Sequence, residues 1–284
     1  MITKTHKTFE EQVEILESRG CYIDNKTFAL QVLSHINYYR FSSYFLPFKR
    51  YDNSDNYIEG TTFRKVYNNY LFDKKLRNLL SSVIEDIEVT IKTKIAYFHS
   101  KKFGPLGYLD KENYNNLFDA ELLETTINKH KERHKNNPII IHHQEKYNSN
   151  FPLWVIIEFF DFSETSKMYS QLDIQLQKAV ARSLNTNRTC LKSWLYCLTH
   201  LRNCCAHYAR IYNSKMISIP ATPNNKPITF DKTIFCYILV IKEIIGETDS
   251  WQDFYSSLTN LLNEFKEDIE LNRMGFPHNW MIYL

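Results

Sequence analysis

Arginine and histidine stand five residues apart at Arg202 and His207, with Asn203 beside the arginine. Near pH 7 a neutral imidazole can take or give a proton, and a guanidinium pairs with phosphate oxygens in a bidentate way. These groups suit the attack of a ribose 2′-hydroxyl on its own phosphodiester, which cuts RNA, spares DNA and leaves a 2′,3′-cyclic phosphate. We therefore predict a catalytic site of Arg202, His207 and Asn203 that uses no metal and no cofactor.

Negative charge is missing around this pair. Residues 174–230 contain no Asp or Glu, although the whole chain has 32. The cations in that stretch are Lys178, Arg182, Arg188, Lys192, Arg202, Arg210, Lys215 and Lys226. Such a setting favours a polyanion, and we expect Arg188, Lys192 and Arg210 to contact RNA. The plainer alternative is that Arg202 forms a structural salt bridge and His207 is a half-buried helix residue.

Helical periodicity predicts how the pair is displayed. The expected helix covers residues 189–213, and its apolar stripe is Trp194, Leu198, Leu201, Cys205, Tyr208 and Tyr212. Arg202 and His207 then lie on the other side, about 140° apart. One helix cannot surround a substrate, so we expect a homodimer in which a second copy of the helix completes the site.

The rest of the chain also reads as a succession of helices. We expect them at 8–19, 26–46, 62–99, 153–161, 164–172, 174–184, 231–246 and 250–271, with a polar, helical excursion at 111–136. With only 6 glycines and 43% hydrophobic residues, the composition is typical of a compact helical protein. No segment has the length and hydropathy of a membrane span and the amino terminus lacks a signal-peptide core, so we expect a cytoplasmic protein.

Four sequence blocks resemble one known family. They are His35–Tyr44, Phe72–Arg77 with Ile87–Lys92, the block that opens at Pro152 and continues through Leu198–Asn213, and Gly275–Trp280. Together they resemble the bacterial abortive-infection proteins of the AbiD and AbiF type, which are assigned to the HEPN superfamily of α-helical ribonucleases. The Arg202–His207 pair matches the catalytic signature of that superfamily. Two departures are Ser163 where glycine is usual and Lys92 where arginine is common.

The resemblance implies a fold and a function. It implies an all-α, HEPN-like helical bundle with an amino-terminal segment at 1–58, a core at 59–230 that includes an excursion at 108–137, and carboxy-terminal helices at 231–284. It also implies phage defence by RNA cleavage, with a small non-coding RNA as a regulator. The alternative function is a catalytically silent RNA-binding scaffold of a defence or toxin–antitoxin system.

Several other residues have two interpretations. Tyr39 and Arg40 could stack on and pair with RNA, or the aromatic residues near them could belong to the core. Lys92 could border the active cleft or simply pair with Glu88. His130 and His134 have the spacing of a helical zinc site, although no third ligand is evident. Cysteines 190, 197 and 204 are about 10.5 Å apart along a helix, too far to share one zinc, and are expected to be reduced packing residues.

Overall fold

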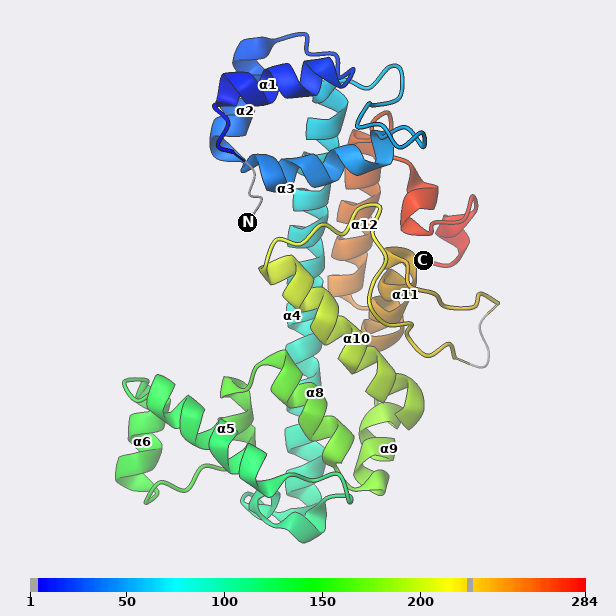
Figure 1. The fold of residues 1–284 in the computed structure, drawn as a ribbon. Helices are drawn as coiled ribbons and strands as arrows, with labels where there is room; N and C mark the ends of the chain where they lie inside the picture. The colour runs from blue at the N-terminus through cyan, green and yellow to red at the C-terminus, as the bar shows by residue number, and fades with distance from the viewer. Residues whose placement is uncertain (1–4, 224–226) are drawn as a thin grey trace.

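The fold is entirely α-helical, as the sequence predicts (Figure 1). The computed structural model describes residues 5–223 and 227–284. Within these ranges there are twelve α-helices and six short 3-10 segments, and β-structure is limited to three isolated bridges. None of the helices in these ranges combines the length and the hydropathy that a membrane span requires.

One long helix organises the molecule. Helix α4 (Phe63–Phe103) has 41 residues and is therefore about 60 Å long. It starts at Thr62, whose hydroxyl accepts a hydrogen bond from the N–H of Lys65, and it ends at Gly104, which has a positive φ of 77°. Most of the helices that follow it in the chain pack along its length (Figure 1). The expected helix at 62–99 is thus present, with one further turn.

The amino-terminal helices form a separate small core at one end of α4. They are α1 (Phe9–Ser18), α2 (Lys26–His35) and α3 (Tyr38–Ser42), followed by a 3-10 segment at Ser43–Phe48. Their buried side chains cluster with the first turns of α4. The single helix expected at 26–46 is wrong, because Ile36 is extended and ends α2, and the side chain of Asn37 accepts the N–H of Tyr39 at 2.8 Å to start α3.

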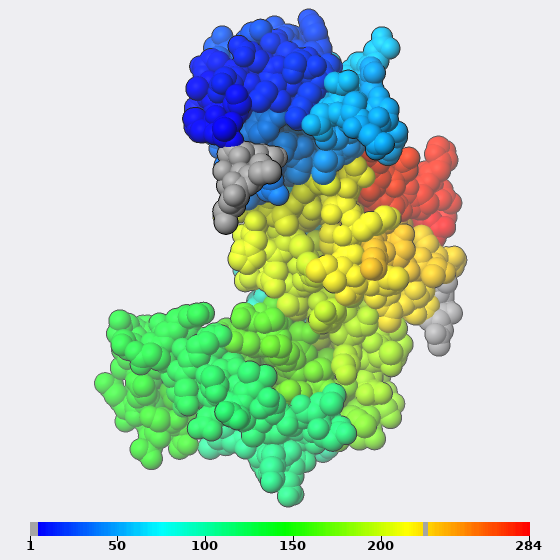
Figure 2. All heavy atoms as spheres, viewed as in Figure 1, coloured from blue at the N-terminus to red at the C-terminus, as the bar shows by residue number. Residues whose placement is uncertain are grey.

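The opposite end of α4 carries a protruding excursion. Helices α5 (Ala120–Arg133) and α6 (Pro138–Lys146) stand out to one side (Figures 1 and 2). The chain returns through α7 (Leu153–Ile156), α8 (Phe162–Gln171) and α9 (Ile174–Arg182). Helix α8 begins with a capping box in which Asp161 and Glu164 bond each other's backbone N–H groups. Because Ser163 lies in this first helical turn, no glycine is needed there.

The remaining helices complete the main core around α4. Helix α10 (Arg188–Ala206) packs on α4, α8 and α9, and α11 (Ile234–Ile245) and α12 (Asp249–Glu264) pack on α4 farther along. One continuous hydrophobic cluster runs from Phe72 to Trp280. The carboxy-terminal helices therefore share the core of the central segment and have none of their own.

Candidate active site

Helix α10 ends sooner than its hydrophobic pattern predicts. Its apolar stripe is buried from Trp194 to Cys205, as expected, but the helix ends at Ala206 instead of continuing to residue 213. Tyr208 adopts a left-handed conformation with φ of 59°. The N–H of Tyr208 then donates to the carbonyl of Cys205 at 3.2 Å, and that of Ala209 to Cys204 at 2.8 Å. These two bonds form a Schellman motif, so His207 caps the helix.

The predicted catalytic residues all reach the surface at this helix end. Asn203 and His207 are exposed, and Arg202 is half-buried. Among residues 5–223 and 227–284, none of these three side chains forms a hydrogen bond or ion pair with another protein group. The structural salt bridge considered for Arg202 is absent from the described part of the chain. A free guanidinium and an exposed imidazole are thus displayed within one turn and a half of α10.

A buried carboxylate fixes the backbone that follows. We call residues 207–212 the post-helix turn. Asp73 of α4 is fully buried, and its Oδ1 accepts the N–H groups of Ile211 at 3.0 Å and Tyr212 at 2.7 Å. Its Oδ2 accepts the hydroxyl of Tyr44 at 2.6 Å and a guanidinium N–H of Arg77. Four donors therefore converge on one carboxyl group.

The protonation state of Asp73 follows from these neighbours. Burial raises the pKa of Asp73 above its ordinary value, although the Arg77 guanidinium and the hydrogen bonds act in the opposite direction. The two backbone N–H groups and the Arg77 guanidinium can only donate, and three such donors favour an ionised acceptor. The ionised form is therefore the one that fits the site, with Arg77 as its counter-ion.

Arginines fasten the amino-terminal core to the post-helix turn. Arg40 donates to the carbonyl of Tyr208 at 2.5 Å and lies 6.0 Å from the centre of its ring. Arg77 donates to the carbonyl of Ala209 at 3.3 Å. Arg210 donates to the carbonyl of Ser43 and is half-buried. Positive groups here also complement the negative end of the α10 dipole.

Some of the residues predicted to contact RNA already bind other groups of the protein. Arg210 is occupied by its carbonyl partner, and Arg40, although exposed, holds Tyr208. Lys92 is buried, pairs with Glu88 at 2.9 Å and donates to the carbonyl of Glu158. The structure therefore places Lys92 inside the protein, in an ion pair with Glu88. Tyr39, by contrast, is 83% exposed.

Arg188 and Lys192 lie at the other end of α10. They line a groove between α8 and α10, together with Lys167 and Tyr196. Lys167 and Tyr196 were not singled out from the sequence, although Tyr196 follows Lys192 at the helical interval of four residues. The structure thus separates Arg188 and Lys192, at the groove, from Arg202 near the end of α10 and Arg210 in the post-helix turn.

Neighbouring cysteines offer no alternative nucleophile. Burial raises the pKa of Cys205 to about 12, so its thiol is neutral at physiological pH. Burial also raises the pKa of Cys204, whose sulfur lies 3.3 Å from Nδ1 of His200. All six cysteines are free. Of the three cysteines whose spacing predicts a packing role, Cys190 and Cys197 are buried and Cys204 is half-buried.

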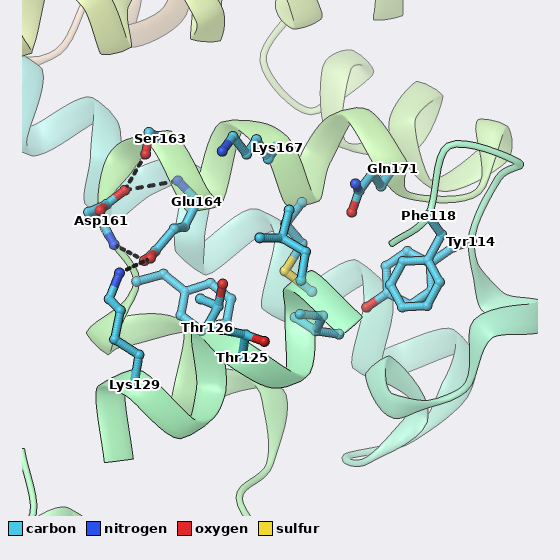
Figure 3. Close-up of a pocket in the computed structure, with 14 residues that line it drawn as sticks. Tyr114, Phe118, Thr125, Thr126, Lys129, Asp161, Ser163, Glu164, Lys167 and Gln171 are labelled. Carbon is cyan, nitrogen blue, oxygen red and sulfur yellow. Dashed lines mark hydrogen bonds and ion pairs between the residues drawn. The ribbon is translucent and has the colours of Figure 1, made fainter. Parts of the chain in front are cut away.

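The His130–His134 pair does not form a metal site in the described residues. His130 is buried, and its Nε2 lies 2.6 Å from Oε2 of Glu164. Glu164 also accepts from Lys129 at 2.6 Å, beside a cavity of about 340 Å³ between α5 and α8 (Figure 3). In residues 5–223 and 227–284 no group of three or more metal-ligating side chains is assembled. Both acidic residues of this cavity already have partners, since Glu164 pairs with Lys129 and Asp161 accepts from the hydroxyl of Ser163 and the N–H of Glu164.

Sequence reasoning missed the residues that support the site. Tyr44, Asp73 and Arg77 belong to the blocks His35–Tyr44 and Phe72–Arg77, which lie far from Arg202 in the sequence. In the folded chain both blocks converge on the post-helix turn. The carboxy-terminal segment also reaches it, because the N–H of Glu270 donates to the hydroxyl of Tyr212 at 3.0 Å. The only sequence evidence for these supporting residues was that the blocks occur together in one chain. The sequence alone could not show that the blocks meet in the folded protein.

A comparison with known protein families matches the part of the chain that contains the two blocks and the post-helix turn. The family model described as Abi-like protein matches residues 31–213, which is most of the chain and includes α3, α4 and α10. The chain therefore belongs to the Abi-like protein family. Searches against curated proteins and against solved structures returned no match.

Proposed function

We propose that this protein is an endoribonuclease of the HEPN type that acts in abortive-infection defence. Membership of the Abi-like family suggests the defence role. The observation that supports the catalytic role is the group of half-buried Arg202 and exposed Asn203 and His207, whose side chains have no partner in the described part of the chain. A buried network fixes the backbone that follows His207. An unpaired surface arginine beside a histidine is suited to a negatively charged substrate.

In this proposal each side chain has a distinct role. Arg202 binds the scissile phosphate and stabilises the charge that develops on its oxygens. His207 transfers a proton, either from the 2′-hydroxyl or to the leaving 5′-oxygen. Asn203 orients the imidazole or bonds a phosphate oxygen. The products are a 2′,3′-cyclic phosphate and a 5′-hydroxyl, because the nucleophile belongs to the substrate.

The site is further proposed to be completed by a second protomer. Asn203 and His207 lie at an exposed helix end, which cannot exclude water from a reacting phosphate by itself. In Figure 2 the yellow segment that follows α10 borders a notch whose other side is the green excursion of α5 and α6. This open surface is where a two-fold related α10 could approach.

A cleavage assay tests the catalytic proposal. We expect His207→Ala to lose at least about 100-fold in cleavage of a labelled RNA while it still binds RNA, since general acid–base catalysis contributes roughly that much. His278→Ala, another exposed histidine, is the matched control and should cleave normally. Full cleavage by His207→Ala would refute the assignment.

Mixing two inactive variants tests the composite site. If Arg202 of one protomer works with His207 of the other, a mixture of Arg202→Ala and His207→Ala chains should regain activity at the heterodimer. A site contained within each protomer predicts no recovery. A small non-coding RNA as regulator is also proposed, and it would co-purify with the protein and be released at high salt.

The second candidate function is an RNA-binding scaffold without cleavage. It is favoured by the grouping of unpaired cations on α10, since the same charges serve binding and catalysis. The two functions separate in the assay above, because a scaffold binds RNA equally well with or without His207 and leaves the RNA intact.

A further inference from the structure

A groove of about 530 Å³ lies between α8 and the first half of α10. Lys167 from α8 and Arg188 and Lys192 from α10 supply its charge, and hydroxyl groups such as those of Ser166 and Thr189 line it as well. No carboxylate takes part in the lining. Within the described residues, none of the three cations forms an ion pair. A groove with three unpaired cations favours an anionic ligand.

An exposed aromatic ring stands in the same groove. Tyr196 is 60% exposed, although it lies on a helix whose other aromatic residue, Trp194, is completely buried. A ring beside cations is the arrangement on which unpaired nucleic-acid bases stack while their phosphates are neutralised. Bases in a duplex are already stacked on each other, so the groove suits a single strand.

The groove lies on the same face of α10 as Asn203 of the proposed active site. Arg188, Lys192 and Tyr196 follow one another at intervals of four residues, and Asn203 lies seven residues farther on. All four therefore fall within about 80° around the helix. Helix α8 lies beside α10 along this course (Figure 1). From Arg188 to His207 the helix rises about 28 Å, which matches roughly eight stacked nucleotides.

We propose that the groove formed by Lys167, Arg188, Lys192 and Tyr196 binds a single-stranded RNA segment that continues from the linkage held at Arg202 and His207. This inference rests on the proposed function only for the identity of the cleaved linkage. The groove supplies affinity and position through phosphate contacts and one stacked base, without reading the sequence. The substrate class is therefore single-stranded RNA several nucleotides longer than the reacting dinucleotide.

Oligonucleotide length tests the proposal. Binding is measured by fluorescence anisotropy with labelled single-stranded RNAs of about 4 and about 12 nucleotides, the longer one spanning the face of α10. The test variant carries Lys167→Ala, Arg188→Ala and Lys192→Ala. Arg182→Ala is the control, because Arg182 is an exposed cation of the same carboxylate-free stretch that does not line the groove. Circular dichroism shows that each variant is folded.

We expect the triple variant to lose roughly 10- to 100-fold in affinity for the long RNA, with its salt slope reduced by about 2, and to bind the short RNA as before. Tyr196→Ala should weaken binding of the long RNA roughly 5-fold or more, while Tyr196→Phe preserves it. Equal affinity of wild type and triple variant for the long RNA would overturn the proposal, as would an equal loss in Arg182→Ala.

The groove proposal and the ribonuclease proposal can be refuted independently of each other. If the wild-type protein cleaves RNA and the groove variants cleave it equally well at every RNA length, the groove proposal is overturned and the ribonuclease proposal stands. Length-dependent binding that needs the groove, without any cleavage, would support the groove and refute the ribonuclease. Tighter binding of duplex than of single-stranded RNA would overturn the single-strand assignment.

Discussion

Asp73 is the residue whose substitution most directly tests how the candidate site is held. We consider Asp73→Asn, which keeps the shape of the side chain and an oxygen for the N–H groups of Ile211 and Tyr212 but removes the charge opposite Arg77. The buried guanidinium then lacks its counter-ion. Breaking a buried ion pair in this way costs about 3–5 kcal/mol, a large part of the roughly 5–15 kcal/mol that stabilises a typical domain.

The effect on cleavage should exceed the effect on folding. The post-helix turn carries His207, and misplacement of a catalytic group by about 1 Å can cost roughly 100-fold in rate. We therefore expect Asp73→Asn to lower the urea midpoint and, at a temperature where it is fully folded, to cleave RNA at least about 10-fold more slowly. Tyr44→Phe removes one hydrogen bond of the same network and should cost only about 1 kcal/mol.

Glu88→Gln is the matched control. Glu88 and Lys92 form another ion pair between residues four apart on α4, and this pair does not contact the post-helix turn. Its loss should destabilise the protein without a specific loss of cleavage. Our interpretation of the Asp73 network would be refuted if Asp73→Asn unfolded at the same urea concentration as wild type. It would also be refuted if Asp73→Asn and Glu88→Gln lost cleavage equally.

Two further predictions concern stability. Burial lowers the pKa of His99 to about 4, and in the described chain neither ring nitrogen has a partner. Above pH 6.5 both folded and unfolded His99 are neutral, but below it the unfolded state binds the proton first. The contribution of His99 to stability should therefore fall by up to about 3 kcal/mol between pH 6.5 and 4. His99→Phe should remove this component, measured as the difference between the two proteins in urea unfolding across that range, and identical pH profiles would contradict it. Gly275 has φ of 84°, and a Cβ there would lie 2.2 Å from Oγ1 of Thr233. Gly275→Ala should cost about 2 kcal/mol or more, whereas Gly60→Ala, with a similar φ in open space, should cost about 1 kcal/mol. Equal thermal shifts for the two glycine variants would argue against the clash.

Helical periodicity was enough to predict the fold class and the long central helix. The apolar positions from Leu76 to Ile95 recur at helical intervals without interruption, and the whole run lies in α4. The breaks were harder to predict, because they depend on polar side chains more than on the pattern. The side-chain oxygen of Asn37 accepts a hydrogen bond from the N–H of Tyr39, so two helices form where one was expected at 26–46.

The end of α10 could not be predicted from its own sequence. Tyr208 and Tyr212 continue the apolar period, and no glycine or proline interrupts it. The chain leaves the helix because Asp73, distant in the sequence, accepts the N–H groups of Ile211 and Tyr212, which a continuing helix would bond internally. A local pattern contains no information about a carboxylate that arrives from another helix.

The same limit applies to the cations. The absence of acidic residues from 174 to 230 makes this stretch of the sequence basic, but the sequence could not show that the guanidinium of Arg210 holds the carbonyl of Ser43. Carbonyl oxygens of the turn and of the amino-terminal core occupy Arg40, Arg77 and Arg210. Of the cations predicted to contact the RNA, Arg188, Lys192 and Arg202 have no ion-pair or hydrogen-bond partner within the described residues, and all three lie on α10. The set of predicted contacts that can still neutralise a polyanion is therefore smaller than the sequence indicates. It follows one helix, which is why the groove and the Arg202–His207 end are proposed to serve the same strand.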